Sequence, residues 1–96
     1  MREKAFDFYL RSDPNITSDM GITSRLRHAN EAESILKISL DVVVADDDMM
    51  YEALLELKKH ETSPRGQKQN ALRKYYIFCN GKEFPRMARY HSIKHP

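Results

Sequence analysis

The sequence predicts an all-α fold, and three observations lead to that prediction. Apolar residues recur three and four positions apart along four segments, which is the period of a helix with one face in a core. Residues that favour turns or end helices, such as Pro14, Pro64 and Gly81, separate these segments. The single β-like run, Val42 to Val44, has no second run to pair with. We therefore expect a compact bundle of four helices with one short extra turn.

The first two helices are defined by their apolar stripes and by Pro14. The first is expected from about residue 2 to residue 11, and it must end near Asp13 because a proline disfavours helical geometry in the residue before it. The second is expected from about residue 22 to residue 36. Its core stripe consists of Ile22, Leu26, Ala29, Ala32, Ile35 and Leu36.

The middle of the chain holds an ambiguous segment and the third helix. Three consecutive valines favour a strand locally, but Ser39 can cap a helical turn, so we favour a short helix or turn over residues 38–44. The three carboxylates at positions 46–48 suit the N-terminus of a helix, where backbone N–H groups need acceptors. This third helix should end at about His60. Its core stripe is Met50, Ala53, Leu54 and Leu57.

The fourth helix is expected from near Gly66 to Asn80, where Asn80-Gly81 is a helix-stop signal. Phe84-Pro85 should then fold back on the domain. We expect one helical domain over residues 1–84 and a loose basic tail over residues 85–96. The buried candidates of the fourth helix are Ala71, Leu72, Tyr75, Tyr76, Phe78 and Cys79.

Size and composition limit the class of protein. A chain of 96 residues with 41% apolar content can close one core and no more. No segment has the pattern of a secretory signal or the length of a membrane span. The lone Cys79 cannot form an internal disulfide and suits a reducing compartment. We expect a soluble cytoplasmic protein.

The charge is distributed unevenly along the chain. Residues 1–61 carry 8 Lys and Arg against 13 Asp and Glu, whereas residues 62–96 carry 8 Lys and Arg against Glu83 alone. The two parts therefore have net charges of about −5 and +7. Clustered Lys and Arg raise the local potential, which attracts phosphate groups and points to an anionic partner. The alternative is that the charges mix once the chain folds.

Catalysis and metal binding find little support in the sequence. Cys79 falls on the apolar side of the fourth helix, where a thiol is a core residue and not a nucleophile. His91 and His95 are four apart, but a zinc site needs three or four ligands and none of the others lies near in sequence. The chain also lacks a glycine-rich phosphate loop. We expect no enzyme activity, no bound metal and no cofactor.

Two helix faces carry the side chains that DNA-binding proteins use. Arg and Lys neutralise phosphates, Gln and Asn pair with adenine, and Arg pairs with guanine in the major groove. Such residues occur near the start of the second helix and along the polar face of the fourth. The candidate nucleic-acid-binding residues are Arg25, Arg27, His28, Arg65, Gln67, Lys68, Asn70, Arg73 and Lys74. Double-stranded DNA is the expected partner.

The segments 24–36 and 63–78 resemble the N-terminal core-binding domain of phage integrases and other tyrosine recombinases. The resemblance covers residues 3–81 and lies in the helix order, the polar start of the second helix, and the Ala71-Leu72-Arg73 run followed by aromatic residues. It implies a SAM-like four-helix bundle whose second and fourth helices lie against DNA. The catalytic domain of that family, with its tyrosine nucleophile, has no counterpart after Gly81.

The acidic middle of the chain suggests a different function. Residues 39–57 contain six carboxylates and no Lys or Arg, a pattern that DNA binding does not explain. A protein-interaction module is therefore the alternative: it would engage a basic partner through this segment, at Asp47, Glu52 and Glu56, or form a homodimer. The leading expectation remains a non-catalytic DNA-binding domain.

Overall fold

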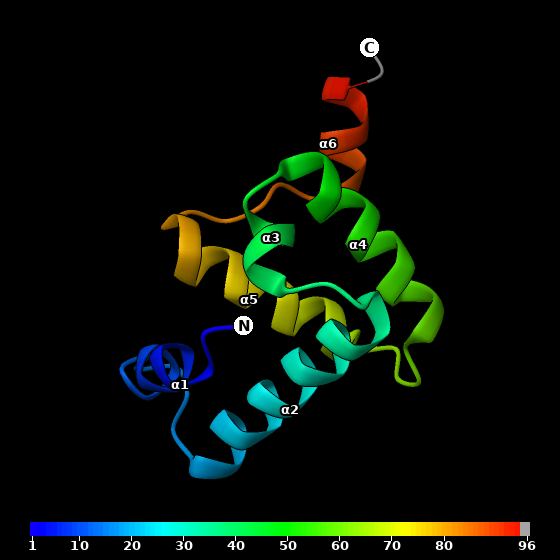
Figure 1. The fold of residues 1–96 in the computed structure, drawn as a ribbon. Helices are drawn as coiled ribbons and strands as arrows, with labels where there is room; N and C mark the ends of the chain where they lie inside the picture. Colours follow the sequence, from blue (N-terminus) through cyan, green and yellow to red (C-terminus); the bar gives the residue numbers. More distant parts are fainter. Residues whose placement is uncertain (95–96) are drawn as a thin grey trace.

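The computed structural model describes residues 1–94, and Figure 1 shows their arrangement. All regular structure in this range is helical, which confirms the predicted class. In chain order the helices are α1 (Glu3–Arg11), α2 (Asp19–Leu36), α3 (Leu40–Val44), α4 (Asp47–His60), α5 (Gln67–Asn80) and α6 (Met87–Lys94). The four long predicted helices correspond to α1, α2, α4 and α5, and the ambiguous segment forms the short helix α3.

The apolar stripes of the helices meet in one core. All four predicted core residues of α4, Met50 to Leu57, are buried, as are Ala71, Leu72, Tyr75 and Tyr76 of α5. Ile22, Ala29 and Ala32 are buried on α2, while the other members of its stripe are half-buried at the edge. Phe84 is buried against Tyr76, with ring centroids 5.3 Å apart, so the segment after α5 does fold back.

Helix starts follow the side chains that can accept backbone N–H groups. α2 begins at Asp19, three residues before the expected start, because the Ser18 hydroxyl accepts a hydrogen bond from the Gly21 N–H at 3.1 Å. On α4 the Asp46 carboxylate accepts from the N–H groups of Asp48 and Met49 at 2.8 and 3.2 Å. The capping role predicted for this acidic run is therefore confirmed for Asp46.

The C-terminal segment differs from the expectation of a loose tail. Residues 87–94 form α6, which carries one buried residue, Tyr90. Its ring packs 5.0 Å from Phe84, and its hydroxyl donates to Asp48 Oδ1 at 2.5 Å. This contact with an acidic residue of α4 fixes a segment that has no apolar stripe of its own. His95 lies outside the described residues.

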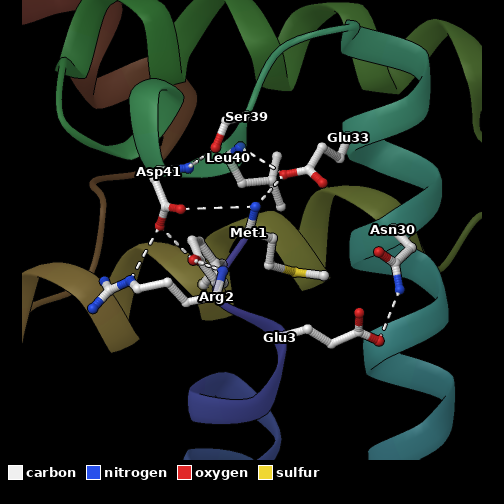
Figure 2. A network of polar contacts seen from close by, with 9 residues as sticks. Met1, Arg2, Glu3, Asn30, Glu33, Ser39, Leu40 and Asp41 are labelled. Atoms are coloured by element: carbon white, nitrogen blue, oxygen red, sulfur yellow. Dashed lines mark hydrogen bonds and ion pairs between the residues drawn. The ribbon is translucent and has the colours of Figure 1, made fainter.

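The chain start joins α1 to three other helices (Figure 2). The N-terminal ammonium of Met1 donates to Glu33 Oε2 of α2 at 2.7 Å, and it lies 3.7 Å from Asp41 Oδ2 of α3. The Arg2 N–H donates to the Tyr75 hydroxyl of α5 at 2.9 Å. Hydrogen bonds from the ammonium and the Leu40 N–H outweigh the effect of burial and hold the pKa of Glu33 below its ordinary value.

The basic residues of the C-terminal third lie in two regions of the molecule, one on α5 and one on α6. α2 packs along α5, and the loop between α1 and α2 lies beside them. α6, with the basic residues Arg89 and Lys94, lies at the far end of the molecule from the start of α2 (Figure 1). The basic C-terminal third of the sequence is thus divided over two places. Within residues 1–94 no helix has both the length and the apolar character needed to cross a membrane.

Candidate functional site

A cleft of about 560 Å³ opens where α2, α5 and the α1–α2 loop meet. We call it the α2–α5 cleft. Six of the nine residues singled out in the sequence line it, from two helices and the loop before α5: Arg25, His28, Arg65, Gln67, Asn70 and Lys74. Asp13, Asn15, Ile16, Ser24 and Ala71 complete its walls.

Helix geometry explains why these residues come together. Successive residues of an α-helix are about 100° apart, so positions separated by three, four or seven share a face. Gln67, Asn70 and Lys74 share one face of α5, and Arg25 and His28 share one face of α2. Because these two helices pack against each other, both faces border the same cleft.

The cleft has an excess of positive charge. Arg25, Arg65 and Lys74 face a single carboxylate in it, that of Asp13. Lys74 Nζ donates to Asp13 Oδ2, and the Asn15 N–H donates to Asp13 Oδ1 at 2.9 Å. The hydrogen bond from Lys74, the one from Asn15 and the nearby charge of Arg25 hold the pKa of Asp13 below its ordinary value. Asp13 is therefore a permanent anion at neutral pH.

His28 is a buried polar side chain in the wall of the cleft. Its side chain is 10% exposed, and neither ring nitrogen has a hydrogen-bond partner among the described residues. Nδ1 lies 3.5 Å from Glu31 Oε1, which makes an ion-pair contact only when the ring is protonated. A buried polar group without a hydrogen bond is uncommon in folded proteins, so His28 is an unusual residue in the wall of the cleft.

The two amide side chains that α5 contributes to the cleft differ in their hydrogen bonding. Asn70 Nδ2 donates to the Arg65 carbonyl at 2.9 Å and so helps to close the turn before α5. Gln67 makes no side-chain hydrogen bond within residues 1–94. It can therefore form two hydrogen bonds with a ligand without losing one inside the protein.

The other three of the nine residues, Arg27, Lys68 and Arg73, lie outside the cleft. Arg27 is exposed and 3.6 Å from Glu31 Oε1, on a different part of α2 that borders a separate hollow with Leu26 and Asn30. Lys68 is buried: its Nζ lies 3.6 Å from Glu31 Oε2 and 3.8 Å from Glu61 Oε1. Lys68, a candidate for DNA contact in the sequence, is thus buried between two carboxylates inside the domain and does not line the cleft.

The prediction for Arg73 also needs correction. It was placed on the polar face of the fourth helix, but its side chain does not face open solvent. Its Nη1 donates to the carbonyl oxygens of Phe84 and Pro85 at 3.0 and 3.3 Å, and its guanidinium lies 5.7 Å from the centre of the Phe84 ring. Burial lowers the pKa of Arg73 from its ordinary value, with the charge of Glu83 acting in the opposite direction. Arg73 therefore holds the segment after α5 in place.

A second surface feature lies on the acidic side of the molecule. A mainly apolar groove of about 470 Å³ runs beside α4 and is bordered by the carboxylates of Asp48, Glu52 and Glu56. Asp47 does not belong to it, since it accepts a hydrogen bond from the Tyr76 hydroxyl at 2.8 Å. Burial of its side chain, together with this hydrogen bond, raises the pKa of Tyr76 to about 12.

The remaining candidates for catalysis or metal binding, Cys79 and His91, contact other side chains of the domain. Cys79 was expected in the core; it is half-buried at the edge, and its Sγ accepts a hydrogen bond from Arg2 Nη2 at 3.1 Å. His91 lies on α6 with its Nδ1 3.2 Å from the Tyr51 hydroxyl. Within residues 1–94 no three His, Cys, Asp or Glu side chains are placed to hold a metal ion together.

Comparison of the chain with protein-family models, with curated proteins and with solved structures gave no match.

Proposed function

We propose that this chain is a non-catalytic DNA-binding domain that grips duplex DNA with α2 and α5 at the α2–α5 cleft. The observation that carries the proposal is the grouping of three cations, three amides and a histidine in the walls of one cleft. Lysine and arginine neutralise phosphates and set the position on the duplex, and amides read base edges. Arg25, Arg65 and Lys74 would contact phosphates, and Gln67 would reach a base.

The composition of the cleft favours duplex over single-stranded nucleic acid. Proteins that bind single strands stack the bases on aromatic side chains, but the walls of this cleft contain no Phe, Tyr or Trp. Most aromatic rings of the chain serve the core, among them Phe6, Tyr75 and Phe84. A groove lined by cations and amides suits a backbone whose bases remain paired.

The helix order supports the relation to integrase core-binding domains. On this proposal α1, α2, α4 and α5 correspond to the four helices of the SAM-like bundle, and α3 and α6 are additions. α2 and α5 would then be the DNA-facing pair, which are the two helices that border the cleft. The acidic side of α4 would face away from the DNA.

The test is the salt dependence of binding to a duplex of random sequence. Each phosphate contact that is lost lowers the slope of log affinity against log salt by about 0.9, so Arg25→Gln with Arg65→Gln should lower it by roughly 2. The matched control is Lys4→Gln with Lys58→Gln, which removes the same charge from two exposed side chains outside the cleft. Equal slopes for the two double variants, or no salt-dependent binding by the parent, would overturn the proposal.

Gln67 separates base reading from charge. Gln67→Ala removes no charge and no hydrogen bond within residues 1–94, so folding and the salt slope should not change. Affinity for a preferred sequence, selected from a random pool, should fall by about 1 to 3 kcal/mol, while affinity for random duplex stays the same. An equal loss on both duplexes would contradict a base contact.

The groove beside α4 supports a second candidate function, the binding of a basic protein segment. Its apolar floor and its border of Asp48, Glu52 and Glu56 would complement an amphipathic helix with Lys or Arg at its edge. Lys94 of α6 lies 3.3 Å from Asp48 Oδ1, so a basic helix already lies at one end of α4. A basic amphipathic peptide should bind the parent and lose affinity for Glu52→Gln; equal binding would exclude this surface.

A further inference from the structure

The α2–α5 cleft already holds one anion, the carboxylate of Asp13. Its side chain is 12% exposed and is held by Lys74 Nζ and by the Asn15 N–H. The charge of Arg25 acts on it from α2. The carboxylate thus occupies Lys74, a cation that an anionic ligand of this cleft would seek.

The cations of the cleft are only partly neutralised by this carboxylate. Arg25 and Arg65 make no ion pair within residues 1–94, and Arg25 Nη1 donates only to the Gly21 carbonyl at 3.0 Å. Two positive charges therefore remain without a counter-charge beside the Asp13–Lys74 pair. Carboxylate and phosphate oxygens accept the same charge-assisted hydrogen bonds from lysine and arginine.

We propose that the α2–α5 cleft is a site for one phosphate group, which takes the place of the Asp13 carboxylate on Lys74 and is held by Arg25 and Arg65 as well. The inference rests on the proposed function, since the phosphate would be a diester of the nucleic-acid backbone. Asp13 then acts against the ligand in two ways: it occupies Lys74, and it repels the phosphate. Removing its charge should strengthen binding.

The perturbation is Asp13→Asn, which keeps an oxygen that can accept from the Asn15 N–H and removes the charge. With Lys74 released, the slope of log affinity against log salt on duplex DNA should become steeper by about 0.9, and a slope change of that size is on the order of tenfold in affinity between 1 M and 0.1 M salt. The matched control is Asp7→Asn on α1, which makes the same change in net charge at an aspartate paired with Arg11 and outside the cleft. Its slope should stay that of the parent.

A second variant isolates the role of Lys74. In a Lys74→Gln background, Asp13→Asn should no longer steepen the slope, because the cation that it releases is absent. If Asp13→Asn has the same effect with and without Lys74, the exchange on Lys74 is refuted. If Asp7→Asn steepens the slope as much as Asp13→Asn, the effect is one of net charge and the phosphate site is refuted.

Inorganic phosphate separates this inference from the proposed function. Titrated into Asp13→Asn, it should shift the backbone amide signals of Arg65, Gln67 and Asn70, with weaker shifts in the parent and none in Asp13→Asn with Lys74→Gln. These shifts without duplex binding would support a phosphate site and overturn DNA binding. Duplex binding by the parent with no difference between Asp13→Asn and Asp7→Asn would support DNA binding and overturn the phosphate site.

Discussion

The clearest prediction on stability concerns Tyr75, which lies at the centre of the domain. Its ring is fully buried and packs edge-on to Phe6 with centroids 4.9 Å apart. Its hydroxyl donates to Asp41 Oδ1 at 2.5 Å and accepts from the Arg2 N–H at 2.9 Å. Burial and the bond to Asp41 raise the pKa of Tyr75 above its ordinary value. The side chain therefore joins the core of α5 to α1 and α3.

The two parts of this side chain can be measured separately. Tyr75→Ala removes a buried aromatic ring and should lower the free energy of unfolding by about 3 to 5 kcal/mol. Tyr75→Phe keeps the ring and leaves the Arg2 N–H without its partner, which should cost about 1 to 2 kcal/mol. The loss should not be larger, because water can replace the Tyr75 hydroxyl at the partly exposed Asp41. Urea unfolding with unchanged m-values is the assay. The control, Tyr51→Phe, changes a hydroxyl at the exposed contact with His91 and should stay within about 0.5 kcal/mol. If Tyr75→Phe matches the control, the hydroxyl does not connect these helices.

The remaining predictions concern pH and Arg73. The pKa of the Met1 ammonium is raised from its ordinary value of 8.0, mainly by its hydrogen bond to Glu33. The stability that this ammonium contributes is therefore present below pH 8.0 and is lost as the pH rises through the pKa of the folded state. Glu33→Gln should remove this alkaline loss in thermal unfolding scans. The lowered pKa of Glu33 contributes stability above 4.5 that is lost as the pH falls further. Arg73→Ala should cost about 1 kcal/mol by loosening the Phe84 segment, whereas exposed Arg27→Ala should stay within about 0.5 kcal/mol; equal unfolding midpoints would contradict the role of Arg73.

Much of the fold could be predicted from the sequence because most helices have a clear apolar stripe. The four core residues of α4 recur at helical spacing, and tertiary packing does not change which face they define. α6 could not be predicted in this way, since Tyr90 is its one buried residue. Tyr90 contacts Phe84 of the preceding segment and Asp48, which is 42 residues away in sequence. The burial of a helix without an apolar stripe depends on contacts with neighbouring elements, which its own sequence does not reveal.

The candidate site was predictable in part, for a geometric reason. Gln67, Asn70 and Lys74 share a face of α5 and were correctly grouped, whereas Lys68 and Arg73 lie to either side of that face and contact other elements. A helix that packs against neighbours on several sides can bury charged residues. Such residues are expected on the solvent side when the sequence is divided into one apolar face and one polar face. Asp13 could not be assigned to the cleft because it is 61 residues from Lys74 and only the fold brings them together.

The central claim is that duplex DNA contacts the α2–α5 cleft, and its most direct test is to follow the backbone amide signals of the protein while a short duplex is added at low salt. We expect the largest shifts at Arg25, Arg65 and Gln67, with the α4 residues Glu52 and Glu56 unchanged. Shifts that cluster beside α4, or an unchanged spectrum, would contradict it.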